Sequence, residues 1–165
     1  MIKKLIVYLR EFRRNAINVQ IDTQTGAILL DSSVLFDFNE YTLTDNGGII
    51  LQQVLPVYCG VLLGDEYSDY VAEIIIEGHT DSSSTAKDKY IDNLKLSQDR
   101  ARAVVEYCKS TITSSKQRTR FESLVTATGK SYSNLIYDRN GNEDPARSRR
   151  VEIKFRLRDS EMIQE

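Results

Sequence analysis

Hydrophobic residues recur along this chain with two different spacings, and each spacing predicts a different kind of element. Helical spacing, in which apolar positions fall three and four residues apart, occurs in residues 2–12, 50–62 and 94–108. Thr44, followed by Asp45, is a suitable N-cap for the second helix, and Asp92 or Asn93 for the third. Pro56 lies inside the second helix, where we expect a kink.

Strand-like patterns alternate with these helices. They occupy residues 18–22, 27–31, 35–38, 72–77, 124–128 and 151–157. The first two flank a turn that contains Gly26 and predict a β-hairpin, whereas residues 72–77 are almost continuously apolar, as in a strand covered on both faces. The order of elements predicts an α/β fold. Strands joined by helices should lie parallel, and the last strand, which a loop precedes, should lie antiparallel.

The amino-acid composition of the chain excludes several functional classes of protein. The chain has 165 residues, with 22 Lys and Arg against 24 Asp and Glu, so its formal net charge is −2. This near-balance argues against a nucleic-acid binder, and the length fits one folded domain. Cys59 and Cys108 both lie in apolar stretches and are expected to be buried free thiols rather than a disulfide framework. Because His79 is the only histidine, we expect no metal site, and no motif indicates a cofactor.

No stretch of the sequence is suited to crossing a membrane. The longest apolar segment, residues 49–63, is interrupted by two glutamines and Pro56, and a span needs about 20 residues. The apolar run near the N-terminus is also too short for a signal peptide. Residues 1–16 instead predict a basic amphipathic helix. This pattern fits a helix packed on its own domain, a dimerising or linker helix, or a helix on a membrane surface.

Candidate chemistry is concentrated where strand 72–77 ends, in the segment Gly78-His79-Thr80-Asp81. Ligands of open α/β sheets bind beyond the carboxyl ends of the strands, so Asp81 is placed to face a ligand. Arg100, in the following helix, is expected at the rim of that helix's buried face. The two side chains could pair with each other. Alternatively, Asp81 could hold an ammonium group and Arg100 a carboxylate of one zwitterionic ligand. No motif supplies a nucleophile beside His79, for which we expect a structural role.

Four segments in order along the chain resemble a known family. They are VLFDFNEYTLTDNG, EGHTDSSS with DNLKLSQDRARAVVEY, ATGKS, and ARSRRVEIKF. Together they are similar to the OmpA C-terminal-like domain, a family that includes the periplasmic domains of OmpA proteins, Pal lipoproteins and MotB-type stator subunits. The resemblance covers residues 34–157. It implies an α/β two-layer sandwich that has a mixed sheet with a βαβαβ-type core, an N-terminal hairpin and an extra N-terminal helix. The implied divisions are a helix or linker at 1–16, the OmpA-like domain at 17–158 and a tail at 159–165.

The resemblance also implies a function, which is noncatalytic binding of peptidoglycan through the diaminopimelate of its stem peptide. Asp81 and Arg100 match the Asp and Arg by which the family binds this ligand. The other matching pocket positions are Thr80, Asn93, Leu96, Ser97 and Arg149. The implied role is to tether a membrane-anchored protein, such as a MotB-like stator subunit, to the cell wall in the periplasm or extracytoplasmic envelope. A membrane anchor is then expected outside this chain, and a homodimer through the N-terminal helix is a further expectation.

Several positions depart from the family pattern. The loop after Asp81 looks longer than in the commonest members, and Asp99 stands immediately before Arg100. Ser148 replaces an Asn before the paired arginines, and Ser131 replaces a Gly. These departures motivate a second hypothesis, in which the domain has the same fold but serves protein interaction or assembly and does not bind peptidoglycan.

Overall fold

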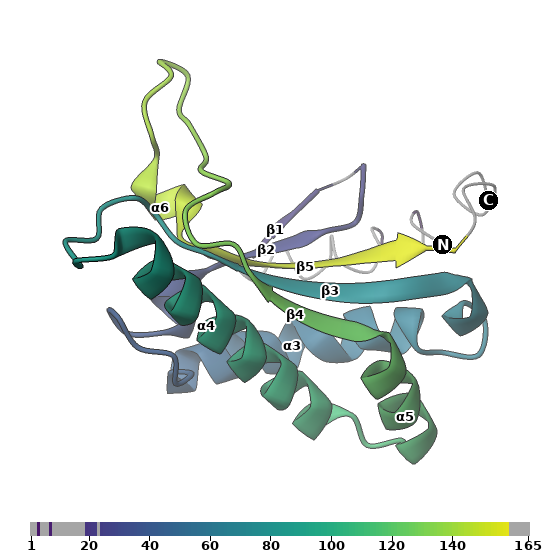
Figure 1. Cartoon of the computed structure of the whole chain (residues 1–165). Helices are drawn as coiled ribbons and strands as arrows, with labels where there is room; N and C mark the ends of the chain where they lie inside the picture. Colours follow the sequence, from purple (N-terminus) through teal and green to yellow (C-terminus); the bar gives the residue numbers. More distant parts are fainter. Residues whose placement is uncertain (1–2, 4–6, 8–18, 23, 159–165) are drawn as a thin grey trace.

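Five strands form one mixed sheet in the computed structural model, which describes residues 3, 7, 19–22 and 24–158 (Figure 1). The strands are β1 (Val19–Ile21), β2 (Ile28–Asp31), β3 (Val71–His79), β4 (Val125–Gly129) and β5 (Arg150–Leu157), in the spatial order β1-β2-β5-β3-β4. β5 runs antiparallel to both β2 and β3, so β2 and β3 point in the same direction. β3 and β4 are parallel neighbours. The predicted hairpin, the parallel strands joined by helices and the antiparallel last strand are therefore confirmed.

The helices and the short helical turns connect these strands. They are α2 (Ser32–Leu35), α3 (Asp45–Leu62), the 3₁₀ turn η1 (Ser68–Tyr70), α4 (Lys89–Thr111), α5 (Ser115–Leu124) and α6 (Pro145–Ser148). The two long helices, α3 and α4, lie on one side of the sheet, which confirms the predicted two-layer sandwich (Figure 1). Thr44 caps α3 as expected, because its hydroxyl oxygen accepts a 2.9 Å hydrogen bond from the Gly47 amide.

The hydrophobic core lies between the sheet and the two long helices. On β3, Ile74 and Ile76 alternate toward the helices, as the period of a strand requires. The apolar stripes of the helices meet this face. Their buried members include Leu51, Val54, Leu55, Tyr58 and Leu62 from α3, and Ala101, Val104 and Cys108 from α4.

Two glycines let α4 approach the sheet at one end. Gly78 of β3 pairs with Gly129 of β4 in the parallel register. A Cβ atom at Gly78 would lie 2.2 Å from the backbone oxygen of Ser97, and one at Gly129 would lie 2.5 Å from the backbone nitrogen of Gln98. No larger residue fits between the strands and the helix there, so the glycines fix the position of the N-terminal half of α4 relative to the end of β3.

The strand predicted at residues 35–38 is wrong. Residues Ser32–Leu35 form the short helix α2, and Phe36 makes only an isolated bridge with Leu43. The cause is a local cap, because Asp31 Oδ1 accepts hydrogen bonds from both the amide and the hydroxyl of Ser33, at 2.8 and 2.7 Å.

The predicted cap of α4 is also wrong, since the helix begins a turn earlier than expected. Asp88 is the N-cap, and its carboxylate accepts a hydrogen bond from the Ile91 amide at 3.2 Å. Asp92 and Asn93 therefore lie inside the helix. Two further helices, α5 and α6, were not predicted. In α5, Phe121 is the sole buried residue, so no apolar stripe marks that helix.

The predicted N-terminal helix at residues 1–16 and the tail at 159–165 lie almost entirely outside the described residues. The divisions at 16 and 158 therefore remain predictions. In the part of the chain that the structure describes, none of the helices combines the length and the apolarity that crossing a bilayer requires.

Candidate functional site

A pocket of about 650 Å³ opens where β3 ends, between α4 and the loop that follows α2. Every sequence-predicted site residue except Ser97 lines it. These residues are Thr80, Asp81, Asn93, Leu96, Arg100 and Arg149. Thr80 and Asp81 come directly after β3, the next three come from the N-terminal half of α4, and Arg149 immediately precedes β5. The volume suits a ligand of small-molecule size.

Asp81 is held in place by its neighbours and remains ionised. It is 6 % exposed, and its Oδ1 atom accepts hydrogen bonds from the amide and the hydroxyl of Ser83 at 3.0 and 2.6 Å. Its Oδ2 atom accepts one from Arg149. Burial raises the pKa of Asp81, but the hydrogen bonds from Ser83 and Arg149 outweigh burial and hold this pKa below its usual value. A carboxylate has room for about four hydrogen bonds, so Asp81 can accept one more from a ligand.

Arg100 is more buried than the sequence indicated. It was expected at a rim, but it is 6 % exposed, because residues 37–40 cover it. Its Nε atom donates to the Glu40 carbonyl at 2.8 Å and its Nη2 atom to the Asp37 carbonyl at 3.3 Å. The guanidinium carbon also lies 5.1 Å from the ring centre of Phe36. Burial and the charge of Arg149 lower the pKa of Arg100 to about 10, so it stays positively charged at neutral pH.

The ion pair in this pocket forms between Asp81 and Arg149, not between Asp81 and Arg100. The two arginines play different parts. Arg100 is held by backbone carbonyls, whereas the Arg149 side chain is 40 % exposed and is held by Asp81. We call Asp81, Arg100 and Arg149 the pocket trio. It holds one negative and two positive charges. Because Asp92, Lys95 and Asp99 also line the pocket, a ligand there meets charges of both signs.

Ser97 supports the pocket from beneath instead of lining it. It is fully buried, donates to the Leu94 carbonyl at 2.9 Å and accepts a hydrogen bond from the Ser131 amide at 3.1 Å. Ser131 has a φ of 52°, in the left-handed region. This backbone conformation explains why the family usually has glycine there. Here the Ser131 hydroxyl contributes a 2.9 Å hydrogen bond to the Tyr90 carbonyl.

Sequence reasoning missed the loop that forms one wall of the pocket. Phe38 and Tyr41 both line it, and Phe38 is 97 % exposed. Asn39, between them, has a φ of 60°, which turns the loop over Arg100. The apolar sequence of residues 35–38 predicts a strand and carries no signal for this exposed position.

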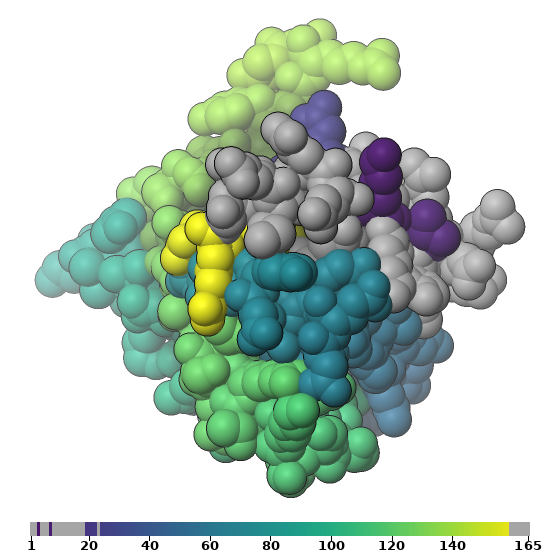
Figure 2. All heavy atoms as spheres, turned by 90° about the vertical axis from the view of Figure 1, so that its right-hand side faces the viewer, coloured from purple at the N-terminus to yellow at the C-terminus, as the bar shows by residue number. Residues whose placement is uncertain are grey.

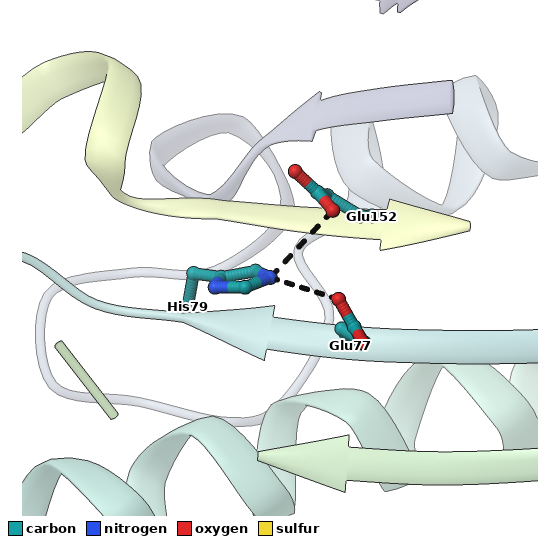
Figure 3. A group of neighbouring side chains, drawn as sticks. All are labelled: Glu77, His79 and Glu152. Carbon is teal, nitrogen blue, oxygen red and sulfur yellow. Dashed lines mark hydrogen bonds and ion pairs between the residues drawn. The ribbon is translucent and has the colours of Figure 1, made fainter. Parts of the chain in front are cut away.

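A second charged group lies behind the pocket, where β3 and β5 pair. Glu77 and His79 project from β3 and Glu152 from β5, and the three side chains point toward one another (Figure 3). His79 Nε2 lies 3.3 Å from Glu77 Oε1 and 3.7 Å from Glu152 Oε2. We call these three residues the rear network. Their ligand atoms lie within 4.8 Å of one another, which is close enough to share a metal ion.

The rear network is already balanced by cations. Lys154 Nζ lies 3.0 Å from Glu77, and Arg150 Nε lies 2.8 Å from Glu152. Burial and the charge of Arg150 lower the pKa of His79, so the imidazole is neutral at neutral pH. A divalent ion would have to displace both salt bridges. The arrangement thus fits a structural role for His79.

A long loop between β4 and α6, residues 130–144, projects from the body of the protein in both views (Figures 1 and 2). Its far end turns at Gly141, which has a φ of 81°. Glu143 on this loop accepts hydrogen bonds from the amide and hydroxyl of Ser82 at 2.9 and 2.5 Å. Ser148 accepts a 2.9 Å hydrogen bond from the Ile136 amide. The loop therefore clamps the segment next to Asp81.

The sequence of this chain is similar to those of known proteins. A family model described as "OmpA family" matches residues 35–153. The Zorya protein ZorB of Escherichia coli is 35 % identical over 142 residues, a match that covers 83 % of this chain and 60 % of ZorB. The chain thus spans less than two thirds of that relative's length.

Two solved structures share the fold. A putative MotB-like protein from Desulfovibrio vulgaris superposes with a TM-score of 0.62 at 21 % identity, covering 96 % of this chain and 92 % of that one. The cell wall anchor of the T6SS from Pseudomonas aeruginosa superposes with a TM-score of 0.60 at 20 % identity, covering 95 % and 97 %. Because the sequence identities are this low, the similarity to these two structures shows a shared fold.

Proposed function

Because this chain belongs to the OmpA family, we propose that its pocket binds the stem peptide of peptidoglycan through the side chain of diaminopimelate. The observation that carries the proposal is the pocket trio, which places a carboxylate and two guanidinium groups around one cavity. The end of a diaminopimelate side chain is a zwitterion, with one ammonium and one carboxylate group. The pocket offers a partner of opposite charge to each of them.

Each member of the pocket trio has a distinct role in this proposal. Asp81 accepts a hydrogen bond from the ligand ammonium with its remaining lone-pair capacity. Arg100 faces the ligand carboxylate. The hydrogen bonds of Arg100 to residues 37 and 40 hold its guanidinium in one orientation before the ligand arrives, which lowers the entropic cost of binding. Arg149 swings from Asp81 to the same ligand carboxylate when the ammonium takes its place.

The biological role that we propose is to tether a membrane-anchored protein, such as a MotB-like stator subunit, to the cell wall. The likeness to a MotB-like protein and to a cell wall anchor supports this role. In this role the domain acts in the extracytoplasmic envelope, with its anchor in a separate segment. We also propose that the function is noncatalytic, as the membership of the OmpA family leads us to expect.

Co-sedimentation with purified sacculi tests the proposal. Wild type should sediment with the wall, and Asp81→Ala and Arg100→Ala should each bind roughly ten- to a hundredfold more weakly. Arg102→Ala is the matched control, because Arg102 lies on the same helix two residues away with its side chain 63 % exposed, outside the pocket. Circular dichroism of each variant shows whether it is folded. A folded wild type that stays in the supernatant would overturn the proposal.

One observation favours a second candidate function. The Asp81 carboxylate is already engaged by Arg149 and Ser83, so the pocket carries an internal partner where the ligand ammonium would bind. An OmpA-like protein-interaction or assembly domain with an altered pocket would keep this closed arrangement. Under that function, sacculi would not retain the wild type, and neither Asp81→Ala nor Arg100→Ala would change sedimentation.

We further propose a homodimer through the N-terminal helix, which rests on its amphipathic sequence alone. Light scattering should give a dimeric mass for the full chain and a monomeric mass after residues 1–16 are removed. A monomeric mass for both proteins would contradict the dimer.

A further inference from the structure

Two cysteine side chains meet in the core between α3 and α4. The Sγ atom of Cys59 lies 3.4 Å from the Sγ atom of Cys108, and the two residues are 4 % and 1 % exposed. Both thiols are free. The sulfur atoms of a disulfide are about 2.05 Å apart, so joining these two requires an approach of roughly 1.4 Å.

The helix that carries Cys59 is weakened on both sides of this residue. Pro56 lies one turn before it and cannot donate a helical hydrogen bond, and Gly60 follows it directly. The space around Gly60 is open, because a Cβ atom there would meet nothing within 4 Å. Cys108 lies in the last turn of α4, which ends at Thr111. Small shifts of these two helix ends can bring the sulfur atoms together without disturbing the core strands.

We propose that Cys59 and Cys108 form a modification site, at which a small disulfide donor oxidises them to an intramolecular disulfide. One thiol loses its proton and attacks the donor RS–SR, which gives a mixed disulfide and releases RSH. The second thiol then attacks the mixed disulfide and releases another RSH. The two cysteines lose two electrons and two protons in total, and the donor gains them.

Oxidation at this site would be slow and controlled by opening of the fold. The hydrogen bond with Cys59 and burial raise the pKa of Cys108 far above its ordinary range, so Cys108 stays a thiol in the folded protein, and both sulfur atoms are buried away from an oxidant. Attack therefore waits for the end of α3 to open. The chemistry is independent of the proposed wall binding, because neither cysteine lines the pocket.

The disulfide would join two helices that hold opposite sides of the pocket wall. α4 carries Arg100, about 12 Å along the helix from Cys108. The residues that cover Arg100, 37–40, lie in the loop that leads into α3. The crosslink closes 49 residues of chain and restricts the unfolded state, so the oxidised protein should melt on the order of 10 °C higher than the reduced protein.

The test is to incubate the full chain with millimolar oxidised glutathione, with and without mild urea, then to unfold it and alkylate the remaining thiols. We expect a monomer about 2 Da lighter that takes up no alkyl group, and a crosslinked peptide pair containing both cysteines after digestion. Dithiothreitol should restore two alkylatable thiols and the lower melting temperature. Cys59→Ala and Cys108→Ala should each give only glutathione adducts or dimers.

The wild-type protein alone decides the outcome, so the proposal stays testable even where a variant fails to fold. It is overturned when both thiols of the wild type remain alkylatable at every glutathione concentration. It is equally overturned when oxidation gives only glutathione adducts or intermolecular crosslinks.

Discussion

The pocket trio and the rear network are built from the same parts of the chain but use charge in opposite ways. Both lie where β3 ends and β5 begins, and both combine carboxylates with basic side chains. In the rear network, Glu77 is paired with Lys154 and Glu152 with Arg150, so each carboxylate has its own cation. In the pocket trio, Arg149 pairs with Asp81, whereas Arg100 donates to two backbone carbonyls instead of to a carboxylate. Two groups of similar composition, a few residues apart, therefore have different capacities for a ligand.

The difference shows how to separate a structural ion cluster from a binding site. Where each carboxylate of a buried group has its own cation, removing one partner destabilises the fold, and little charge is left for a ligand. A group with surplus charge that lines a cavity retains hydrogen-bonding capacity. The predictions below test this contrast.

The largest effect should come from Gly78→Ala, which disrupts the close approach of α4, the helix that carries Arg100, to β3. The new methyl group would lie 2.2 Å from the Ser97 carbonyl oxygen, so α4 must move away from β3. We expect a loss of more than about 4 kcal/mol in the free energy of unfolding, measured by urea titration. Gly60→Ala is the matched control, because its methyl group meets nothing within 4 Å, and it should stabilise α3 by up to about 1 kcal/mol. Equal free energies of unfolding for the two variants would show that the close approach of α4 to Gly78 does not exclude a methyl group.

Glu77→Ala should damage stability but leave the pocket intact. It removes one carboxylate from the rear network, which takes the ion pair from Lys154 and leaves His79 with Glu152 alone. The expected loss is on the order of 3 kcal/mol in urea unfolding. Sacculus binding of the folded fraction should be unchanged. A loss of binding in folded Glu77→Ala protein would show that the rear network acts on the ligand.

Asp81→Asn should produce the reverse result. The amide keeps the shape of the side chain but loses the charge that would hold an ammonium group. We expect wall affinity to fall by about 1.5–3 kcal/mol, while the free energy of unfolding falls by less than that. Affinity comes from depletion isotherms on sacculi and stability from urea titration of the same preparation. Unchanged affinity would show that the Asp81 carboxylate does not bind the ligand.

The rear network should also make stability depend on pH. His79 is packed against Glu77 on its own strand and against Glu152 and Arg150 on β5, and its pKa in the fold is lowered. The unfolded chain, with a histidine pKa of about 6.5, then binds more protons than the folded chain as the pH falls below 7. Stability should be full above pH 7 and should decline as the pH falls from 7 toward 5. His79→Gln should flatten this decline between pH 7 and 5, and an unchanged slope would exclude His79 as its source.

The smallest effect should come from Phe38→Ala. This side chain is 97 % exposed at the pocket wall, so its removal should leave the melting temperature unchanged. A ligand that covers part of the ring would lose apolar contact area, and we expect wall affinity to fall less than tenfold. Titration of the variant against sacculi measures this loss, and a change in melting temperature would contradict the free exposure of the ring.

The sequence predicts part of the pocket trio but not the rear network. Asp81 and Arg100 could be predicted because a strand end and a nearby helix face are local properties. The rear network could not, since it depends on the pairing of Glu77 with Glu152 across two strands far apart in sequence. The Arg149–Asp81 ion pair is nonlocal in the same way, because it joins residues 68 positions apart.

The errors in secondary structure have local causes. A strand was predicted at 35–38 because the stretch is apolar, and the Asp31 cap directed the preceding residues into a helix instead. The helix α5 was missed because it buries only Phe121 and therefore lacks a stripe. By contrast, the strand predicted at 72–77 lies within β3, where β-branched side chains and burial agree.

The central claim is that the pocket recognises a zwitterion, and the most direct test compares two soluble stem peptides by isothermal titration calorimetry. The peptides are identical except that one carries diaminopimelate and the other lysine, which lacks the side-chain carboxylate. The wild-type protein should bind the diaminopimelate peptide at least about tenfold more tightly, because only that peptide engages both Asp81 and the arginines. Equal affinity for the two peptides, or no binding to either, would contradict the account.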